Sequence, residues 1–235
     1  MRICVIGARG GSEGLPDKNV RELLGKPLIV WSIEQARSSG LFDRVIVSTD
    51  SKEIAKVSAT AGAEIPFVRP ASLSDSKAGK FGVWKHALDA CELHFGEVYD
   101  TYVDLDCTNP LRDVSDIQAA VRQFESVRLD GVDAVFSVCD ARKNPYFNLV
   151  EPNEDGNLQM CKRSDDTVIR RQDAPTVYEH VASIYVLASD YIKRANHLLD
   201  GRTRGYIIGV DKSFDIDSEL DFRIVENLMK HKYGV

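Results

Sequence analysis

The sequence has no excess of positive charge. It contains 30 lysine and arginine residues against 36 aspartate and glutamate residues, which gives a formal net charge of −6. Nucleic acids and anionic membranes are bound through basic surfaces, so this composition gives no general electrostatic reason to bind either of them. We therefore expect no nucleic-acid partner and no membrane partner, while a local basic pocket for a small anion is still possible.

Long apolar runs and paired cysteines are also missing. The run Ile3–Ile6 is about half as long as a signal-peptide core and is soon followed by Arg9. No stretch of roughly 18 apolar residues occurs that could span a membrane. The 5 cysteines are odd in number and form no CxxC pair, so they predict neither a disulfide framework nor a zinc knuckle. These absences predict a cytoplasmic protein.

Short β-branched runs alternate with stretches of helical periodicity in the first part of the chain. The runs at 3–6, 45–48, 101–106 and 134–138 predict strands. Such alternation is typical of a mainly parallel sheet flanked by helices, and 235 residues with 43% hydrophobic side chains can bury one sizeable core. We therefore predict a single α/β domain over residues 1–235.

Two helix starts are predicted from capping boxes, in which an N-cap side chain and an acidic residue three positions later bind each other's backbone. Asp50 with Glu53 forms one such pattern, and Ser218 with Asp221 forms another. A further helix over 27–37 is predicted from its proline start and its apolar stripe.

The alternation of strand-like and helix-like segments ends at about residue 140. Tyr146–Val150, Val177–Leu187 and Tyr206–Val210 have the composition of strands, but the intervening segment Glu151–Ala174 is polar and irregular. An insertion of this length usually serves a site or a partner.

A glycine-rich turn, ARGGSEGLPDKN at residues 8–19, follows the first predicted strand. Such a turn can bring backbone N–H groups up to phosphate oxygens. Arg9 stands where the dinucleotide-binding GxGxxG pattern needs its first glycine, and no GxxxxGK[ST] pattern fits. Arg9 and Lys18 at the two ends, with Ser12 and Asn19 as neutral donors, describe a polyphosphate clamp. A surface turn with solvated charges is the alternative.

Ordered blocks along nearly the whole chain resemble the acylneuraminate cytidylyltransferase family. They are ARGGSEGLPDKN with LLGKPLIVWSIEQARSSGLFDRVIVSTDS, then GAEIPFVRP, DLDCTNPLRD, RRQDAP and FDIDSELDF. The resemblance implies a Rossmann-like sheet with a protruding dimerisation arm, at about 140–180 in this chain, and hence a homodimer. It also implies a Mg²⁺-dependent reaction of CTP with a nonulosonic acid, a nine-carbon 2-keto sugar acid, that releases pyrophosphate.

The resemblance assigns the first blocks to the nucleotide. It implies that Arg9 and Lys18 hold the CTP phosphates and that the Ala8–Gly10 backbone and Asn19 meet the nucleotide. In-line attack on the α-phosphate puts charge on the leaving pyrophosphate, and preorganised cations are the main way to stabilise it. Arg69 corresponds to a family arginine near the nucleotide, with a salt-bridged loop arginine as the alternative.

Two aspartates near the end of the chain are the predicted metal ligands. Asp215 and Asp217 flank Ile216, so both carboxylates point to one side of an extended segment. Carboxylate oxygens suit a hard divalent ion. The family places its metal-binding aspartates at this motif, which implies that these two residues hold Mg²⁺, although one of them could instead cap the last helix.

The residues after the third predicted strand depart from the sialic acid members of the family. Asp106 stands where those members carry glutamine, and Cys107-Thr108-Asn109 replaces their Pro-Thr-Ser. Because a carboxylate accepts from a sugar amide or hydroxyl, Asp106 is predicted to contact the sugar, and Thr108 and Asn109 beside it are predicted to belong to the same sugar site. Asp104 and Asp106 could instead form a DxD metal site, and the sequence does not decide between the two roles.

Three later residues complete the predicted sugar site. By the resemblance, Arg171 in RRQDAP reaches the sugar carboxylate, which a guanidinium fork can bind at two points, and Gln172 lies beside it. His180 lies next to this site in sequence and could accept a proton.

The departures favour an N-acylated legionaminic acid as the sugar. YEHVASIY carries Val181 and Ser183 in place of the Asn and Ala of the sialic acid pattern Tyr-x-x-Asn-Gly-Ala-Ile-Tyr, and KNPYF at 143–147 resembles the legionaminic branch. Gly14-Leu15-Pro16 resembles the pseudaminic branch less. Sialic and pseudaminic acids are the alternatives. A nucleotide-sugar-dependent glycosyltransferase and a catalytically inactive nucleotide-binding regulator are more remote ones.

Overall fold

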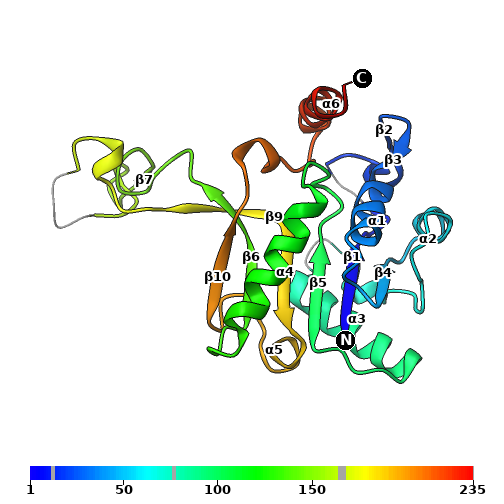
Figure 1. The fold of residues 1–235 in the computed structure, drawn as a ribbon. Coiled ribbons are helices and arrows are strands. Elements are labelled where there is room, and N and C mark those ends of the chain that lie inside the picture. Colours follow the sequence, from blue (N-terminus) through cyan, green and yellow to red (C-terminus); the bar gives the residue numbers. More distant parts are fainter. Residues whose placement is uncertain (12–13, 76–77, 164–167, 235) are drawn as a thin grey trace.

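The computed structural model describes residues 1–11, 14–75, 78–163 and 168–234. A six-stranded sheet with the order β10-β6-β9-β5-β1-β4 forms its centre (Figure 1). Strand β9 runs antiparallel to its neighbours β5 and β6, and the other neighbouring pairs are parallel. The strands are β1 Arg2–Gly7, β4 Arg44–Ser48, β5 Thr101–Leu105, β6 Ala134–Asp140, β9 Tyr178–Ala188 and β10 Thr203–Ile207. The prediction of a mainly parallel sheet is confirmed.

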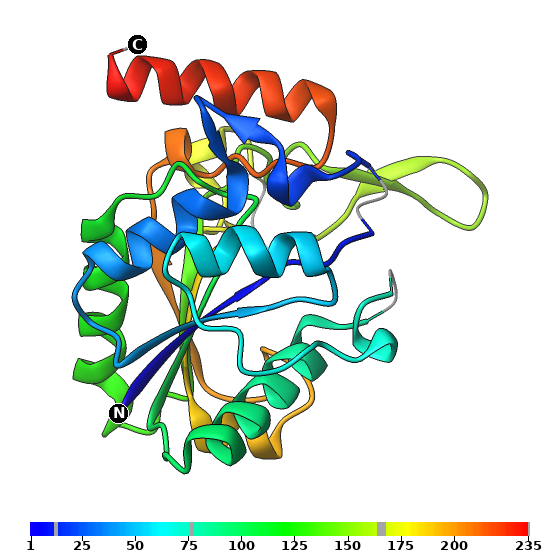
Figure 2. The same cartoon turned by 90° about the vertical axis from the view of Figure 1, so that its right-hand side faces the viewer.

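Helices cover both faces of this sheet (Figures 1 and 2). Helices α1 and α4 pack together on one face, and α3 and α5 pack together on the other. The helices are α1 Leu28–Ser38, α2 Lys52–Thr60, α3 Lys80–Phe95, α4 Val114–Arg128, α5 Ser189–Arg194 and α6 Glu219–Tyr233. The 3₁₀ turns are Lys18–Val20, Ala71–Leu73, Arg171–Asp173 and Val210–Lys212. Among the described residues, no helix combines the length and apolar character needed to cross a membrane.

The predicted apolar stripes pack onto the sheet. Ile29 and Ile33 of α1 and Leu88 and Cys91 of α3 are fully buried. Burying one such aliphatic side chain contributes about 1.5–3 kcal/mol, so the stripes fix which side of each helix faces the core. All 5 cysteines are free, as expected from their spacing.

One of the two predicted capping boxes is confirmed and the other is wrong. The Ser218 hydroxyl and the Asp221 carboxylate cap α6 reciprocally. Helix α2 begins one residue later than predicted, because its N-cap is Ser51, whose Oγ accepts the Ile54 N–H at 3.3 Å. Asp50 therefore remains outside the helix and points toward the glycine-rich turn.

An arm between β6 and β9 projects from the sheet (Figure 1). It carries a hairpin of β7 Val150–Pro152 and β8 Leu158–Met160; a second small hairpin, β2 Glu22–Leu23 with β3 Lys26–Pro27, lies near the start of the chain. The strand predicted at Tyr146–Val150 is wrong except at its last residue.

Local hydrogen bonding explains this error in the arm. The Asn144 side chain accepts the Tyr146 N–H at 2.9 Å, and its carbonyl accepts three further backbone N–H groups. An Asn-Pro pair with such self-bonding makes a turn and competes with strand pairing.

Candidate active site

A cavity of about 520 Å³ opens beyond the carboxyl ends of β1 and β5. Open α/β sheets bind ligands at this edge, because the loops that follow the strands converge there. The predicted site residues among those lining it are Ala8, Arg9, Lys18, Asn19, Arg69, Asp104, Asp106, Thr108 and Asp217. The fold thus brings most of the predicted nucleotide site together.

The glycine-rich turn is joined directly to the predicted metal motif. Lys18 Nζ donates to the Ile216 carbonyl at 2.6 Å and to Asp217 Oδ1 at 3.0 Å. A Cβ atom on Gly14 would lie 2.3 Å from the Asp217 carbonyl oxygen, so only glycine permits this approach. Lys18 is therefore held in place before any ligand arrives.

The other predicted residues of this turn differ in whether their polar groups already have hydrogen-bond partners. The Arg9 guanidinium lines the cavity and has no hydrogen bond or ion pair with a described residue. Asn19 is buried and donates through Nδ2 to the Arg9 carbonyl at 3.0 Å. The Gly10 N–H already binds Asp50 Oδ1 at 2.9 Å, and Ser12 lies outside the described residues. In this turn the Arg9 guanidinium is therefore available to a ligand, whereas the Gly10 N–H is not.

Arg69 is a buried cation at the cavity wall. Its Nε donates to Ser48 Oγ at 3.1 Å, and its Nη2 donates to the Ser48 carbonyl. Burial lowers the pKa of Arg69, and no described carboxylate forms an ion pair with it. The alternative of a salt-bridged loop arginine finds no partner in the described residues, and the position suits a bound anion.

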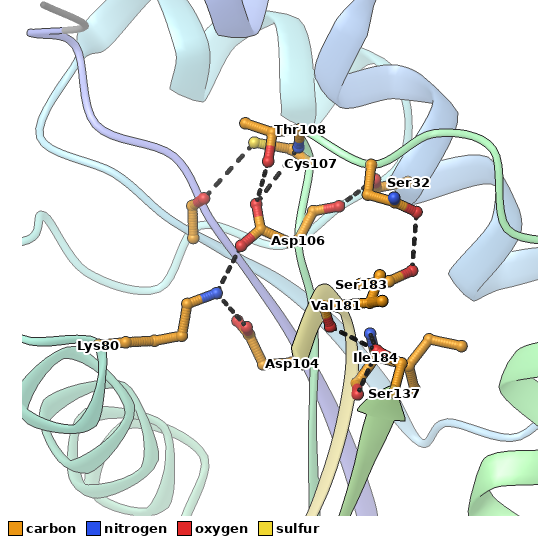
Figure 3. A network of polar contacts seen from close by, with 12 residues as sticks. Ser32, Lys80, Asp104, Asp106, Cys107, Thr108, Ser137, Val181, Ser183 and Ile184 are labelled. Carbon is orange, nitrogen blue, oxygen red and sulfur yellow. Dashed lines mark hydrogen bonds and ion pairs between the residues drawn. The ribbon is translucent and has the colours of Figure 1, made fainter. Parts of the chain in front are cut away.

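A lysine that the sequence analysis did not single out lies between the two aspartates of the DLD motif (Figure 3). Lys80 Nζ is 3.2 Å from Asp104 Oδ2 and 2.5 Å from Asp106 Oδ2. It also lies 4.6 Å from the centre of the Tyr185 ring. Asp106 Oδ1 accepts from the Thr108 hydroxyl at 2.9 Å.

The two aspartates differ in acidity. Burial raises the pKa of Asp104, and the Lys80 charge only partly opposes this effect. Burial also acts on Asp106, but the charge of Lys80 and the hydrogen bonds from Lys80 and Thr108 outweigh it and lower the pKa of that carboxyl. Asp104 and Asp106 push the pKa of Lys80 well above its usual range despite burial, so the lysine stays charged.

A fully buried arginine holds the loop that carries these groups. Arg112 Nη1 donates to the carbonyls of Asp106 at 2.8 Å and Asn109 at 2.6 Å. Burial lowers the pKa of Arg112 to about 10. Asn109 is also fully buried and bonds the carbonyls of Lys212 and Phe214. The structure places Asn109 behind the cavity wall, where it ties the DLD loop to the chain before Asp215.

Of the two predicted metal ligands, Asp217 lines the cavity and Asp215 does not. Burial, followed by repulsion from Asp217 and Asp106, raises the pKa of Asp215. In the described part of the chain, no three side chains of the types that ligate metals are grouped to hold an ion. Mg²⁺ is usually held by one or two carboxylates, with water and substrate phosphates completing its shell. A repelling carboxylate pair beside a phosphate cavity fits that requirement.

The predicted sugar residues Arg171, Gln172 and His180 do not line this cavity. Arg171 and Gln172 lie in an exposed 3₁₀ turn of the arm, where Arg171 Nη2 donates to the Ala141 carbonyl at 2.6 Å. His180 lines a second cavity of about 500 Å³, and its ring packs 5.4 Å from that of Tyr185. Partial burial and the Lys80 charge lower the pKa of His180, which favours the neutral imidazole.

A family model described as cytidylyltransferase matches residues 3–227. The chain belongs to the cytidylyltransferase family. This cytidylyltransferase is 40% identical over 230 residues to the CMP-N,N'-diacetyllegionaminic acid synthase of Campylobacter jejuni, covering 98% of this chain and 95% of that protein. It is 41% identical over 228 residues to a pseudaminic acid cytidylyltransferase of Campylobacter jejuni, covering 97% and 96%.

The fold of the cytidylyltransferase is similar to that of a CMP:2-keto-3-deoxy-manno-octonic acid synthetase complexed with CTP. The TM-score is 0.72 at 17% identity, covering 98% of this chain and 99% of the other. The predicted family and its Rossmann-like α/β fold are thus confirmed. The family match and the full-length relatives make the protein a CTP-dependent nucleotidyltransferase.

Proposed function

We propose that this cytidylyltransferase joins CTP to a nonulosonic acid and releases pyrophosphate. Among the sugars named for its relatives, we propose an N-acylated legionaminic acid as the substrate. The names of the full-length relatives support this class of sugar. The observation that carries the proposal is the cavity lined by Arg9, Lys18 and Asp217 at the carboxyl ends of the strands, where Lys18 pairs with Asp217. It offers two cations for a triphosphate, of which Lys18 is held in place, next to the Asp217 carboxylate for a metal ion.

In this mechanism the protein neutralises and orients the triphosphate. Arg9 and Lys18 bind its phosphate oxygens, and Asp215 and Asp217 would hold Mg²⁺, which supplies further positive charge to the phosphates when bound. The sugar hydroxyl attacks the α-phosphate in line with the departing pyrophosphate. A new P–O bond to the sugar forms, the bond to pyrophosphate breaks, and the hydroxyl proton passes to a base.

The second cavity supports the placement of an N-acylated sugar. Besides His180 it is lined by the apolar side chains of Leu198, Leu199 and Ile207, which suit the methyl groups of acyl substituents. The neutral imidazole of His180 is able to accept a proton there.

A homodimer is part of the proposal. Arg171 and Gln172 lie on the arm, away from the cavities of their own chain, and can meet a sugar only if one subunit's arm reaches the other subunit. Exposed apolar residues on the arm, among them Leu158 and Ile169, support such a contact. We place the reaction in the cytoplasm, where free cysteines stay reduced.

Pyrophosphate release measured over a panel of nucleotides and sugar acids tests the function. We expect CTP to be preferred over UTP, ATP and GTP, and N-acylated legionaminic acid to give the highest kcat/KM with CTP. Because identities of 40% and 41% do not separate the legionaminic and pseudaminic relatives, the panel includes both sugars and sialic acid. Equal turnover of sialic and legionaminic acids would overturn the choice of sugar.

A further inference from the structure

Two aspartates in a DxD pattern beside a triphosphate cavity would ordinarily be taken as ligands for a metal ion. In this protein the space between them holds an ammonium group. Lys80 Nζ is within hydrogen-bond distance of both Asp104 Oδ2 and Asp106 Oδ2. The remaining oxygen of Asp106 is engaged by the backbone and hydroxyl of Thr108.

The charges in this cluster match one another. Asp104 is buried in β5 with its side chain 5% exposed, while the side chain of Lys80 is 39% exposed and lines the cavity. Burial favours the neutral form of Asp104, whereas Asp106 is held ionised. The Lys80 ammonium group thus already occupies the position between the two carboxylates that a divalent ion would take, and it offsets part of their negative charge.

A single aromatic ring, that of Tyr185, lies between Lys80 and His180. Lys80 lines the first cavity, and the Tyr185 ring beneath it packs against His180 of the second. If nucleotide and sugar occupy these cavities as proposed above, the α-phosphate and the sugar acid approach each other next to Lys80. Both groups are anionic, and a cation at this junction stabilises the charge that develops during attack.

We propose that Lys80 replaces a second metal ion at the Asp104–Asp106 pair and is a catalytic residue that contacts the reacting phosphate. This assignment rests on the proposed function. It makes Asp215 and Asp217 the metal-binding aspartates, and Asp104 and Asp106 the residues that hold Lys80.

Substitutions of Lys80 test the catalytic part. We expect Lys80→Met to lower kcat for pyrophosphate release about 100-fold, which is typical of losing one preorganised stabilising group. Lys80→Arg keeps the charge and should retain activity within about tenfold of wild type. Lys85→Met is the matched control on the same helix, outside the cavity lining, and should change kcat less than twofold. A wild-type kcat in Lys80→Met would overturn the proposal.

A further variant separates catalysis from mere charge neutralisation. Asp104→Asn removes one buried carboxyl, so the double variant Lys80→Met/Asp104→Asn should regain thermal stability if the single variant loses it. The proposal expects kcat to stay low in that double variant. Recovery of both stability and kcat would give Lys80 only a structural role and overturn the proposal.

Mn²⁺ binding, counted by electron paramagnetic resonance without nucleotide or sugar, tests the metal part. We expect Lys80→Met to bind one more Mn²⁺ per chain than wild type, and the further change Asp106→Asn to abolish it. If wild type already binds an ion that Asp106→Asn removes, the pair is a metal site and the proposal fails. This readout needs no turnover, so it stands apart from a failure of every sugar in the panel.

Discussion

Lys18 and Asp217, which lie 199 positions apart in the sequence, form an ion pair in which Nζ is 3.0 Å from Oδ1. The contact joins the glycine-rich turn after β1 to the acidic motif before α6. The Lys18 side chain is only 13% exposed, whereas that of Asp217 is 76% exposed. The lysine is thus fixed by its surroundings, and the aspartate can exchange this partner for a ligand.

Lys18→Met should lower kcat/KM for CTP by about 10²- to 10³-fold, because it removes a preorganised cation from the leaving group. Steady-state pyrophosphate release at saturating sugar measures the effect. Lys230→Met is a suitable control, since Lys230 also forms a 3.0 Å ion pair but on the surface of α6, with Glu226. A loss of similar size in both variants would contradict the role of Lys18.

Asp217→Asn should raise the Mg²⁺ concentration needed for half-maximal activity at least tenfold. Mutation of a residue that only hydrogen-bonds a metal ligand typically lowers metal affinity about 10- to 100-fold. Loss of a ligand itself should lower the affinity at least as much. Asp211→Asn, in the 3₁₀ turn just before the motif, is the control. An unchanged Mg²⁺ requirement in Asp217→Asn would exclude it as a ligand.

Gly14→Ala should destabilise the protein by about 1–3 kcal/mol, the usual cost of forcing an atom into a packed position. The added Cβ would lie 2.3 Å from the Asp217 carbonyl oxygen. Urea unfolding followed by fluorescence measures the change. Gly11→Ala is the matched control, because a Cβ there would meet no atom of the described residues within 4 Å. Equal unfolding midpoints for the two variants would argue against this close contact.

The ion pair of Arg44 with Glu97 should make part of the stability depend on pH. Hydrogen bonds from Arg44 and from Tyr99 lower the pKa of Glu97 from about 4.5 to about 2. Since the folded-state pKa is the lower one, this stabilisation is complete above about pH 4.5 and is lost as the pH falls toward 2. Glu97→Gln should therefore be less stable than wild type at pH 7, with the difference shrinking below pH 4.5. The free energies of unfolding of both proteins, measured at several pH values, check this. A stability difference between wild type and Glu97→Gln that is the same at pH 7 and pH 2.5 would contradict the role of this ion pair.

Leu158→Asp should weaken the proposed dimer. Leu158 lies in β8 of the arm and is 72% exposed, and a carboxylate there would be buried without a partner if the arm contacts a second subunit. Light scattering after size-exclusion chromatography measures the mass. Leu129→Asp, at a 97% exposed position after α4, should leave the mass unchanged. A wild-type monomer would overturn the dimer itself.

The parts of the fold that followed from the sequence are those with strong local signals. The capping box of Ser218 and Asp221 is correct, because each of these side chains binds the backbone N–H of the other at the start of α6. Asp50 was wrongly given the same role, because its carboxylate binds the Gly10 N–H instead, a contact over 40 positions. The antiparallel direction of β9 also has no local signature.

The site was predictable where motif and strand end coincide, as for Arg9 and Lys18 after β1. Lys80 was missed because a lysine at a helix start has the appearance of a surface residue. The signal was indirect: the buried Asp104 needs a counter-charge, and Lys80 begins the helix that packs on the same face of the sheet. Only the fold shows that Lys80 supplies the counter-charge that Asp104 needs.

The narrow base of the arm has a consequence for how this family can diversify. The Ala141 N–H donates to the Val177 carbonyl at 3.2 Å, directly beside the paired residues Asp140 and Tyr178. The two ends of the arm therefore meet at a closed neck, and doubling its length would add only about 0.6 kcal/mol of closure entropy. Arms of different size and sequence can be exchanged at this neck while the strand register, and with it the chemistry at the sheet edge, is kept.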